Sequence, residues 1–89
     1  MALAGNPRKH ARDIGEGYVL LTPVLLRGYG VADLSTLKQA VELHLRDTRG
    51  EAPPRNDLVA VQAKQRRILR LNQALRVIRA FAFKRRLPV

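Results

Sequence analysis

Basic side chains crowd the last third of this sequence, and no acid lies among them. Residues 58–89 contain nine Lys and Arg and no Asp or Glu, whereas residues 1–57 contain eight Lys and Arg and all seven acids. Nine minus none and eight minus seven give net charges of +9 and +1, which sum to +10. Because like charges on a helix repel, a solvated helix without a binding role usually mixes signs, so this asymmetry favours a polyanionic partner. The predicted nucleic-acid-binding residues are Lys64, Arg66, Arg67, Arg70, Arg76, Arg79, Lys84, Arg85 and Arg86.

Arginine outnumbers lysine seven to two in this stretch. A guanidinium group suits bidentate contact with phosphate or carboxylate. We therefore expect a small nucleic-acid-binding protein, a regulator or accessory factor, that contacts the phosphates of DNA or RNA. The alternative is a protein–protein adaptor or inhibitor that docks its amphipathic basic helix on an acidic partner protein. A basic face that is merely solvated, without a partner, also agrees with this composition. The predicted partner-helix contacts are Leu75, Ile78, Phe81 and Phe83.

Catalysis and metal binding find little support in the residue types. The chain has no cysteine, which excludes disulfides, thiolate nucleophiles and cysteine-based metal sites. The acids are scattered singly, His10 and His44 are far apart, and Ser35 is the only serine. The Gly15-Glu-Gly17 stretch lacks the third glycine of a dinucleotide-binding loop. We expect no enzyme, no metal and no cofactor.

A cytoplasmic, soluble protein is the expectation from hydropathy. No stretch approaches the 18 or more apolar residues that a membrane-spanning helix needs. We expect the apolar face of the basic helix to form the core of the hairpin, and not to bind a membrane surface. The apolar opening of residues 1–5 is far too short for the core of a signal peptide.

The basic residues require one long helix to position them. Asn56 or Asp57 can cap a helix over about residues 57–86, which contains no glycine or proline and ends before Pro88. Apolar residues recur along it at steps of three and four, as in the contact stripe of packed helices. This stripe consists of Val61, Ile68, Leu71, Leu75, Ile78 and Ala82.

A second helix is predicted over residues 33–48, because apolar residues recur there at three- and four-residue steps. Its apolar face consists of Leu34, Leu37, Val41 and Leu45. A short helix is predicted over residues 23–28, where Thr22 can cap and a proline follows. Residues 1–13 are predicted to form a flexible basic arm, and the apolar run Tyr18–Leu21 is either a strand or an extended segment lying on the helices.

These elements predict an all-α fold in a single small domain over residues 14–89: an antiparallel helical hairpin with a short extended or helical segment packed on it. The short connection over residues 50–56 would place Leu45 near Leu58 and Val61. The longer helix would then leave an apolar patch without a helix to cover it, and either the segment 18–26 or a second copy, in a homodimer, would bury it. The patch would consist of Ile78, Phe81, Ala82 and Phe83.

Overall fold

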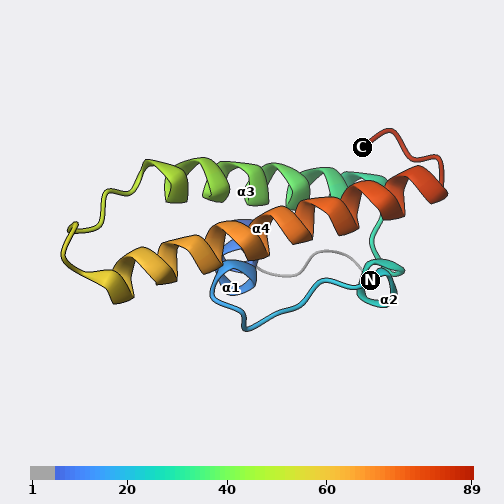
Figure 1. Cartoon of the computed structure of the whole chain (residues 1–89). Coiled ribbons are helices and arrows are strands. Elements are labelled where there is room, and N and C mark those ends of the chain that lie inside the picture. Colours follow the sequence, from blue (N-terminus) through green and yellow to red (C-terminus); the bar gives the residue numbers. More distant parts are fainter. Residues whose placement is uncertain (1–5) are drawn as a thin grey trace.

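Four helices make up the fold. The computed structural model describes residues 6–89, and these contain no strand. The helices are α1 (Pro7–Gly15), α2 (Pro23–Leu26), α3 (Val31–Gly50) and α4 (Leu58–Lys84). Helices α3 and α4 lie side by side as an antiparallel hairpin, with α1 packed against both and α2 packed near the C-terminal end of α4 (Figure 1). The predicted all-α hairpin is confirmed, in a molecule of 45 × 24 × 19 Å.

The helices begin where side chains can satisfy their first amide groups. Thr22 and Asp57 each accept a hydrogen bond from the amide three residues later, at 3.3 and 3.0 Å. Both predicted caps are therefore confirmed. Helix α3 begins at Val31, two residues earlier than predicted, because the Asp33 carboxylate accepts a hydrogen bond from the Gly30 amide at 3.4 Å and so closes the first turn.

The flexible arm predicted for residues 1–13 is wrong for the part of it that forms α1. Asn6 caps this helix and Pro7 occupies its first turn, the usual residue types for a helix start. Ala11 and Ile14 are buried against the hairpin, so packing holds α1 in place although its outer face is charged. Residues 1–5 of the predicted arm lie outside the described residues.

Helix α1 ends in a glycine-dependent turn. Gly17 has a φ of +82°, a conformation that glycine adopts at little cost. The Gly17 and Tyr18 amides donate to the carbonyl oxygens of Ile14 and Asp13, at 3.1 and 2.9 Å. These two bonds define a Schellman motif. A Cβ atom at Gly17 would also lie 2.9 Å from the guanidinium carbon of Arg70, but that group is the end of a flexible side chain, so the backbone conformation is what requires glycine here.

The run after α1 is an extended segment lying on the helices, one of the two predicted forms. Its side chains alternate, as they do in any extended chain. Leu21 is buried and Val19 packs against the core, whereas Tyr18 and Leu20 are exposed. The segment thus contributes one apolar edge to the core.

The core lies between α3, α4 and α1. The predicted apolar face of α3 is confirmed, because all four of its residues are buried. Helix α4 contributes its C-terminal two thirds, and α2 contributes Leu26, which has no exposed surface. The buried residues of α4 are Leu71, Ala74, Leu75, Ile78, Phe81 and Ala82.

The hairpin register differs from the prediction. Leu45 shares a surface hollow with Asn72 and Leu75, and it does not meet the start of α4. The connection between the helices contains two prolines, which favour an extended backbone, and it carries the chain past the end of α3 before α4 turns back (Figure 1). The first turns of α4 therefore overhang α3, and Leu58 and Val59 are exposed.

This shift covers most of the patch that was predicted to be bare. Ile78, Phe81 and Ala82 are buried within the chain, and only Phe83 is exposed, at 84%. Besides α3 and α2, the tail after α4 helps to cover the core, because Leu87 and Val89 pack against it. The homodimer stays a prediction, but the apolar surface that suggested it is reduced to one phenylalanine.

Candidate functional site

The nine basic residues of the chain's last third form two groups. Three of them, Lys64, Arg67 and Arg70, lie on the side of α4 that faces α1 and the end of α3, and each contacts this chain's own oxygens. The other six are exposed. They are Arg66, Arg76, Arg79, Lys84, Arg85 and Arg86.

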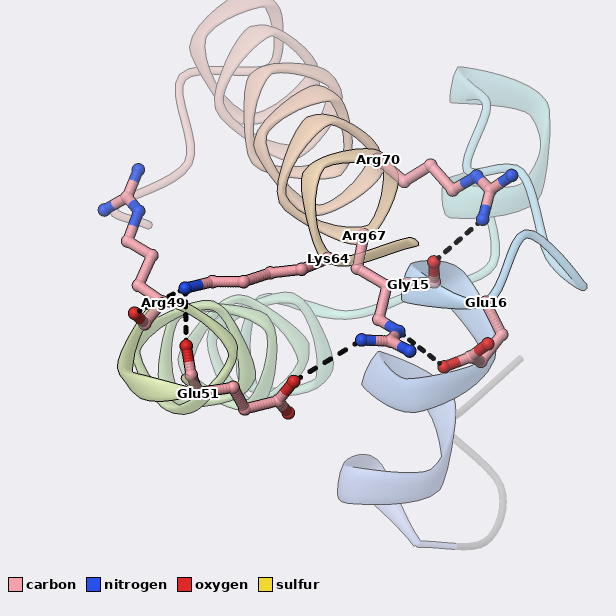
Figure 2. A network of polar contacts seen from close by, with 7 residues as sticks. All are labelled: Gly15, Glu16, Arg49, Glu51, Lys64, Arg67 and Arg70. Carbon is pink, nitrogen blue, oxygen red and sulfur yellow. Dashed lines mark hydrogen bonds and ion pairs between the residues drawn. The ribbon is translucent and has the colours of Figure 1, made fainter. Parts of the chain in front are cut away.

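Two cations of the first group neutralise the ends of neighbouring helices. The Nζ atom of Lys64 donates to the carbonyl oxygens of Arg49 and Glu51 at 3.2 and 2.6 Å, at the C-terminus of α3. A guanidinium nitrogen of Arg70 donates to the carbonyl oxygen of Gly15 at 3.1 Å, at the C-terminus of α1 (Figure 2). The last carbonyl groups of a helix have no partner within it and carry partial negative charge. Both cations therefore act as helix caps supplied from another helix.

Arg67 lies between these two caps and bridges two acids. Its Nε atom donates to Glu16 at 3.0 Å, and a terminal nitrogen donates to Glu51 at 3.4 Å (Figure 2). Its side chain is only 27% exposed. Three residues predicted to contact nucleic acid are thus engaged within the chain, where they tie α1, α3 and α4 together.

The six exposed cations have no such partners. Within residues 6–89, none of them forms an ion pair with a carboxylate or donates a side-chain hydrogen bond. Five of them fall at the C-terminal end of α4 and just beyond it, and we call these five the C-terminal cationic cluster. Its members are Arg76, Arg79, Lys84, Arg85 and Arg86. The guanidinium carbon of Arg85 lies 4.7 Å from the centroid of the Phe81 ring, a cation–π contact that keeps the charge at the surface.

Arg86 has the most unusual backbone in the cluster. Its φ of +54° is the left-handed conformation, and it is the only described non-glycine residue with positive φ. The amides of Arg86 and Leu87 donate to the carbonyl oxygens of Phe83 and Ala82, at 3.1 and 2.8 Å, so α4 also ends in a Schellman motif. Glycine is the common residue at this position, and an arginine there costs conformational energy.

Of the four residues predicted to contact a partner helix, three are buried within the chain. Leu75, Ile78 and Phe81 are buried in this chain's own core, each with less than a tenth of its surface exposed. Only Phe83 is available to another molecule. A basic helix that inserts these four side chains into a partner's groove would first have to leave its own hairpin.

One cation near the cluster was missed by sequence reasoning. Arg27, at the end of α2, lines the same surface hollow as Arg76, Lys84 and Arg85. No local signal in the sequence links Arg27 to α4, because the contact depends on how α2 packs.

His44 has a structural place. It is half-buried on α3, and a Cβ atom at Gly15 would lie 3.5 Å from its Nε2 atom. That nitrogen and the Thr48 hydroxyl are buried without a hydrogen-bond partner.

Residues 6–89 contain neither a metal-binding cluster nor a membrane-spanning helix. No three His, Asp or Glu side chains come together there in a way that could hold a metal ion. None of the helices in that range combines the length and the apolar character that crossing a bilayer requires. Comparisons with protein-family models, with curated proteins and with solved structures find no match for this chain.

Proposed function

We propose that this protein binds DNA or RNA through the C-terminal cationic cluster, as a small regulator or accessory factor. The observation that carries the proposal is that five cations lie within eleven residues without any carboxylate partner among the described residues. Cations placed so close together repel one another, and a polyanion relieves that repulsion while it releases its own counterions.

Arginine geometry favours phosphate as the bound group. Four of the five cluster members are arginines, and the planar guanidinium group donates two parallel hydrogen bonds to a phosphate. The cluster extends over residues 76–86, about 15 Å along a helix axis. That span matches several successive phosphates of one strand, which follow one another every 3.4 Å or so along a duplex axis.

The backbone of Arg86 adds independent support. A residue held in a costly conformation is a candidate for function when a cheaper residue would serve the fold equally well. Glycine would serve this turn better than arginine. The arginine therefore brings something other than stability, and the property that it adds to the tail is positive charge.

The test is a titration of a labelled short duplex, and of the matching single strand, at several salt concentrations. Each phosphate neutralised on a duplex contributes about −0.9 to the slope of log K against log salt, so five contacts give about −4.5. Affinity should then fall about 500-fold between roughly 50 and 200 mM salt. If neither strand form is bound at the lowest salt, the proposal is wrong.

Matched variants locate the interface. Arg79→Gln removes one cluster cation and should reduce the slope by about 1 and weaken binding to all sequences alike. Arg55→Gln removes the same charge from the exposed connection at the opposite end of the molecule (Figure 1). It should change the affinity less than Arg79→Gln does. Equal effects of the two variants would place the binding surface elsewhere.

A further inference from the structure

An apolar hollow lies between α2 and the C-terminal half of α4. Its volume is about 380 Å³, within the range of about 300–1,000 Å³ that is usual for binding sites with an apolar lining. Nearly all of its exposed surface is apolar. The lining residues are Pro23, Arg27, Arg76, Val77, Ala80, Phe81, Lys84 and Arg85.

The hollow has a charged rim of one sign. Four of its eight lining residues are cations, one directly after α2 and three at the end of α4 or directly after it, and none is an acid. None of the four has a carboxylate partner among residues 6–89. An apolar hollow that is lined by four cations complements a ligand that is itself apolar on one face and acidic beside that face.

A second hollow continues the first along α4. It lies between α4 and the extended segment that follows α1, and it shares Arg76 and Val77 with the first hollow. Together the two follow α4 from Arg70 to Arg85. Fifteen helical residues span about 22 Å. This length exceeds that of a typical small-molecule ligand and equals about four turns of a helix.

The two hollows together form one groove along α4. We propose that this groove receives an amphipathic helix of a partner protein, with an apolar face flanked by Asp and Glu. Helices commonly bind in this way, by laying apolar side chains at three- and four-residue spacing into an apolar groove. Val77 and Ala80 would contact the apolar face, and Arg27 and Lys84 would pair with the flanking acids. This inference does not depend on nucleic-acid binding.

The groove suits a protein better than a nucleic acid. A sugar–phosphate backbone can use the rim cations, but its polar phosphates and sugars offer little apolar surface to place on Val77 and Ala80. Base stacking would need an accessible aromatic face, and Phe81 is buried.

The probe is a labelled synthetic peptide of about fifteen residues, made of Leu and Glu and patterned to be apolar on one helical face. Two control peptides accompany it: one with the same composition in scrambled order, and one with Lys in place of Glu. We expect the patterned acidic peptide to bind at least about tenfold more tightly than the scrambled one, and the Lys peptide not to bind. Equal binding of the patterned and scrambled peptides would overturn the proposal.

Ala80→Gln tests the floor without changing any charge. Ala80 is exposed, so the variant should fold, and its amide would have to be desolvated by a docked helix. Peptide affinity should therefore fall by about tenfold, while affinity for duplex DNA should be unchanged. Ala32→Gln, at an exposed position of α3, is the matched control and should leave peptide affinity unaltered.

Amide chemical shifts of the full chain identify the occupied surface. The patterned peptide should shift resonances of residues 23–27 and 76–85, and sedimentation should show one chain for each peptide. Shifts confined to other residues would refute the groove, and so would a duplex that shifts these amides when the peptide does not. A self-associated chain whose shifts match those of the peptide complex would assign the groove to a second copy and overturn the proposal. Loss of duplex binding alone would leave the groove intact and refute only the nucleic-acid function.

Discussion

Arg86 combines an unfavourable backbone conformation with a positive charge at the surface. Its amide and that of Leu87 close the last turn of α4, which requires the left-handed conformation at position 86. Any residue with a Cβ atom pays for that conformation, and glycine does not. The cost and the positive charge therefore reside in the same side chain.

Arg86→Gly should separate these two properties. Relief of the backbone strain should raise the free energy of unfolding by about 1 kcal/mol, as measured by urea denaturation. Loss of the charge should weaken duplex binding and lower its salt slope by about 1. A variant that gains stability and keeps full affinity would remove Arg86 from the interface.

Arg85→Gly is the control, because it removes the same charge from the neighbouring position. Arg85 has a φ of −94°, so glycine relieves no strain there and adds flexibility to the unfolded chain. The free energy of unfolding should fall by about 0.5–1 kcal/mol. If both substitutions raise the free energy of unfolding, reduced charge repulsion and not relief of strain would explain the stabilisation by Arg86→Gly.

At the scale of the elements, one side of α4 holds the other helices in place. Lys64, Arg67 and Arg70 are separated by three residues each, so they follow one side of the helix. They meet the C-termini of α3 and α1 and the two acids between them. Helix α1 is short, and these polar contacts fix its end beside its buried apolar residues.

Arg67→Gln should weaken this junction of three helices. Loss of the contacts with Glu16 and Glu51 should lower the free energy of unfolding by about 1 kcal/mol, the upper range for partly exposed ion pairs. Arg66→Gln, which removes an unpaired and exposed cation, should change it by less than about 0.5 kcal/mol. Equal effects in urea denaturation would show that net charge, and not the bridge, matters.

The elements differ in how far the sequence predicts them. The caps at Thr22 and Asp57 and the apolar face of α3 depend on neighbours within a few residues, and these predictions are confirmed. Helix α1 was missed because its polar side chains outweigh two buried apolar residues, although Asn6-Pro7 before it and Gly17 after it are ordinary helix boundaries.

Long-range contacts explain the remaining differences. Glu16 and Glu51 lie 51 and 16 residues from Arg67 along the chain, so no spacing rule could identify the bridge. The hairpin register depends on how far the proline-containing connection extends past α3. Because the register differs from the prediction, Ile78 and Phe81 are buried within the chain. Hence the basic character of α4 was predictable, but the division of its cations into paired and unpaired groups was not.

At the scale of the whole molecule, charge and shape together define an uneven particle. The described acids lie on α1, α3 and the turns and loops, and α4 has none. Five unpaired cations, those of the C-terminal cationic cluster, lie at one end of a molecule 45 Å long. With a net charge of +10, the folded state carries substantial self-repulsion at low ionic strength.

Salt should therefore stabilise this protein. The Debye length falls from about 30 Å at 0.01 M to about 8 Å at 0.15 M, so repulsion across the cluster is strong in the first condition and largely screened in the second. The same salt weakens the ion pairs of Arg67, but this is one bridging cation, whereas the C-terminal cationic cluster contains five unpaired ones. We expect the free energy of unfolding to rise by about 1 kcal/mol, which corresponds to a Tm increase of about 4–8 °C for a chain of this size.

The measurement is thermal denaturation in sodium chloride at constant pH, with an Arg79→Gln/Arg85→Gln double variant as control. The double variant should be less sensitive to salt than the native chain, because it has lost two of the repelling charges, and a Tm that falls with salt in the native chain would mean that attractive ion pairs dominate its surface.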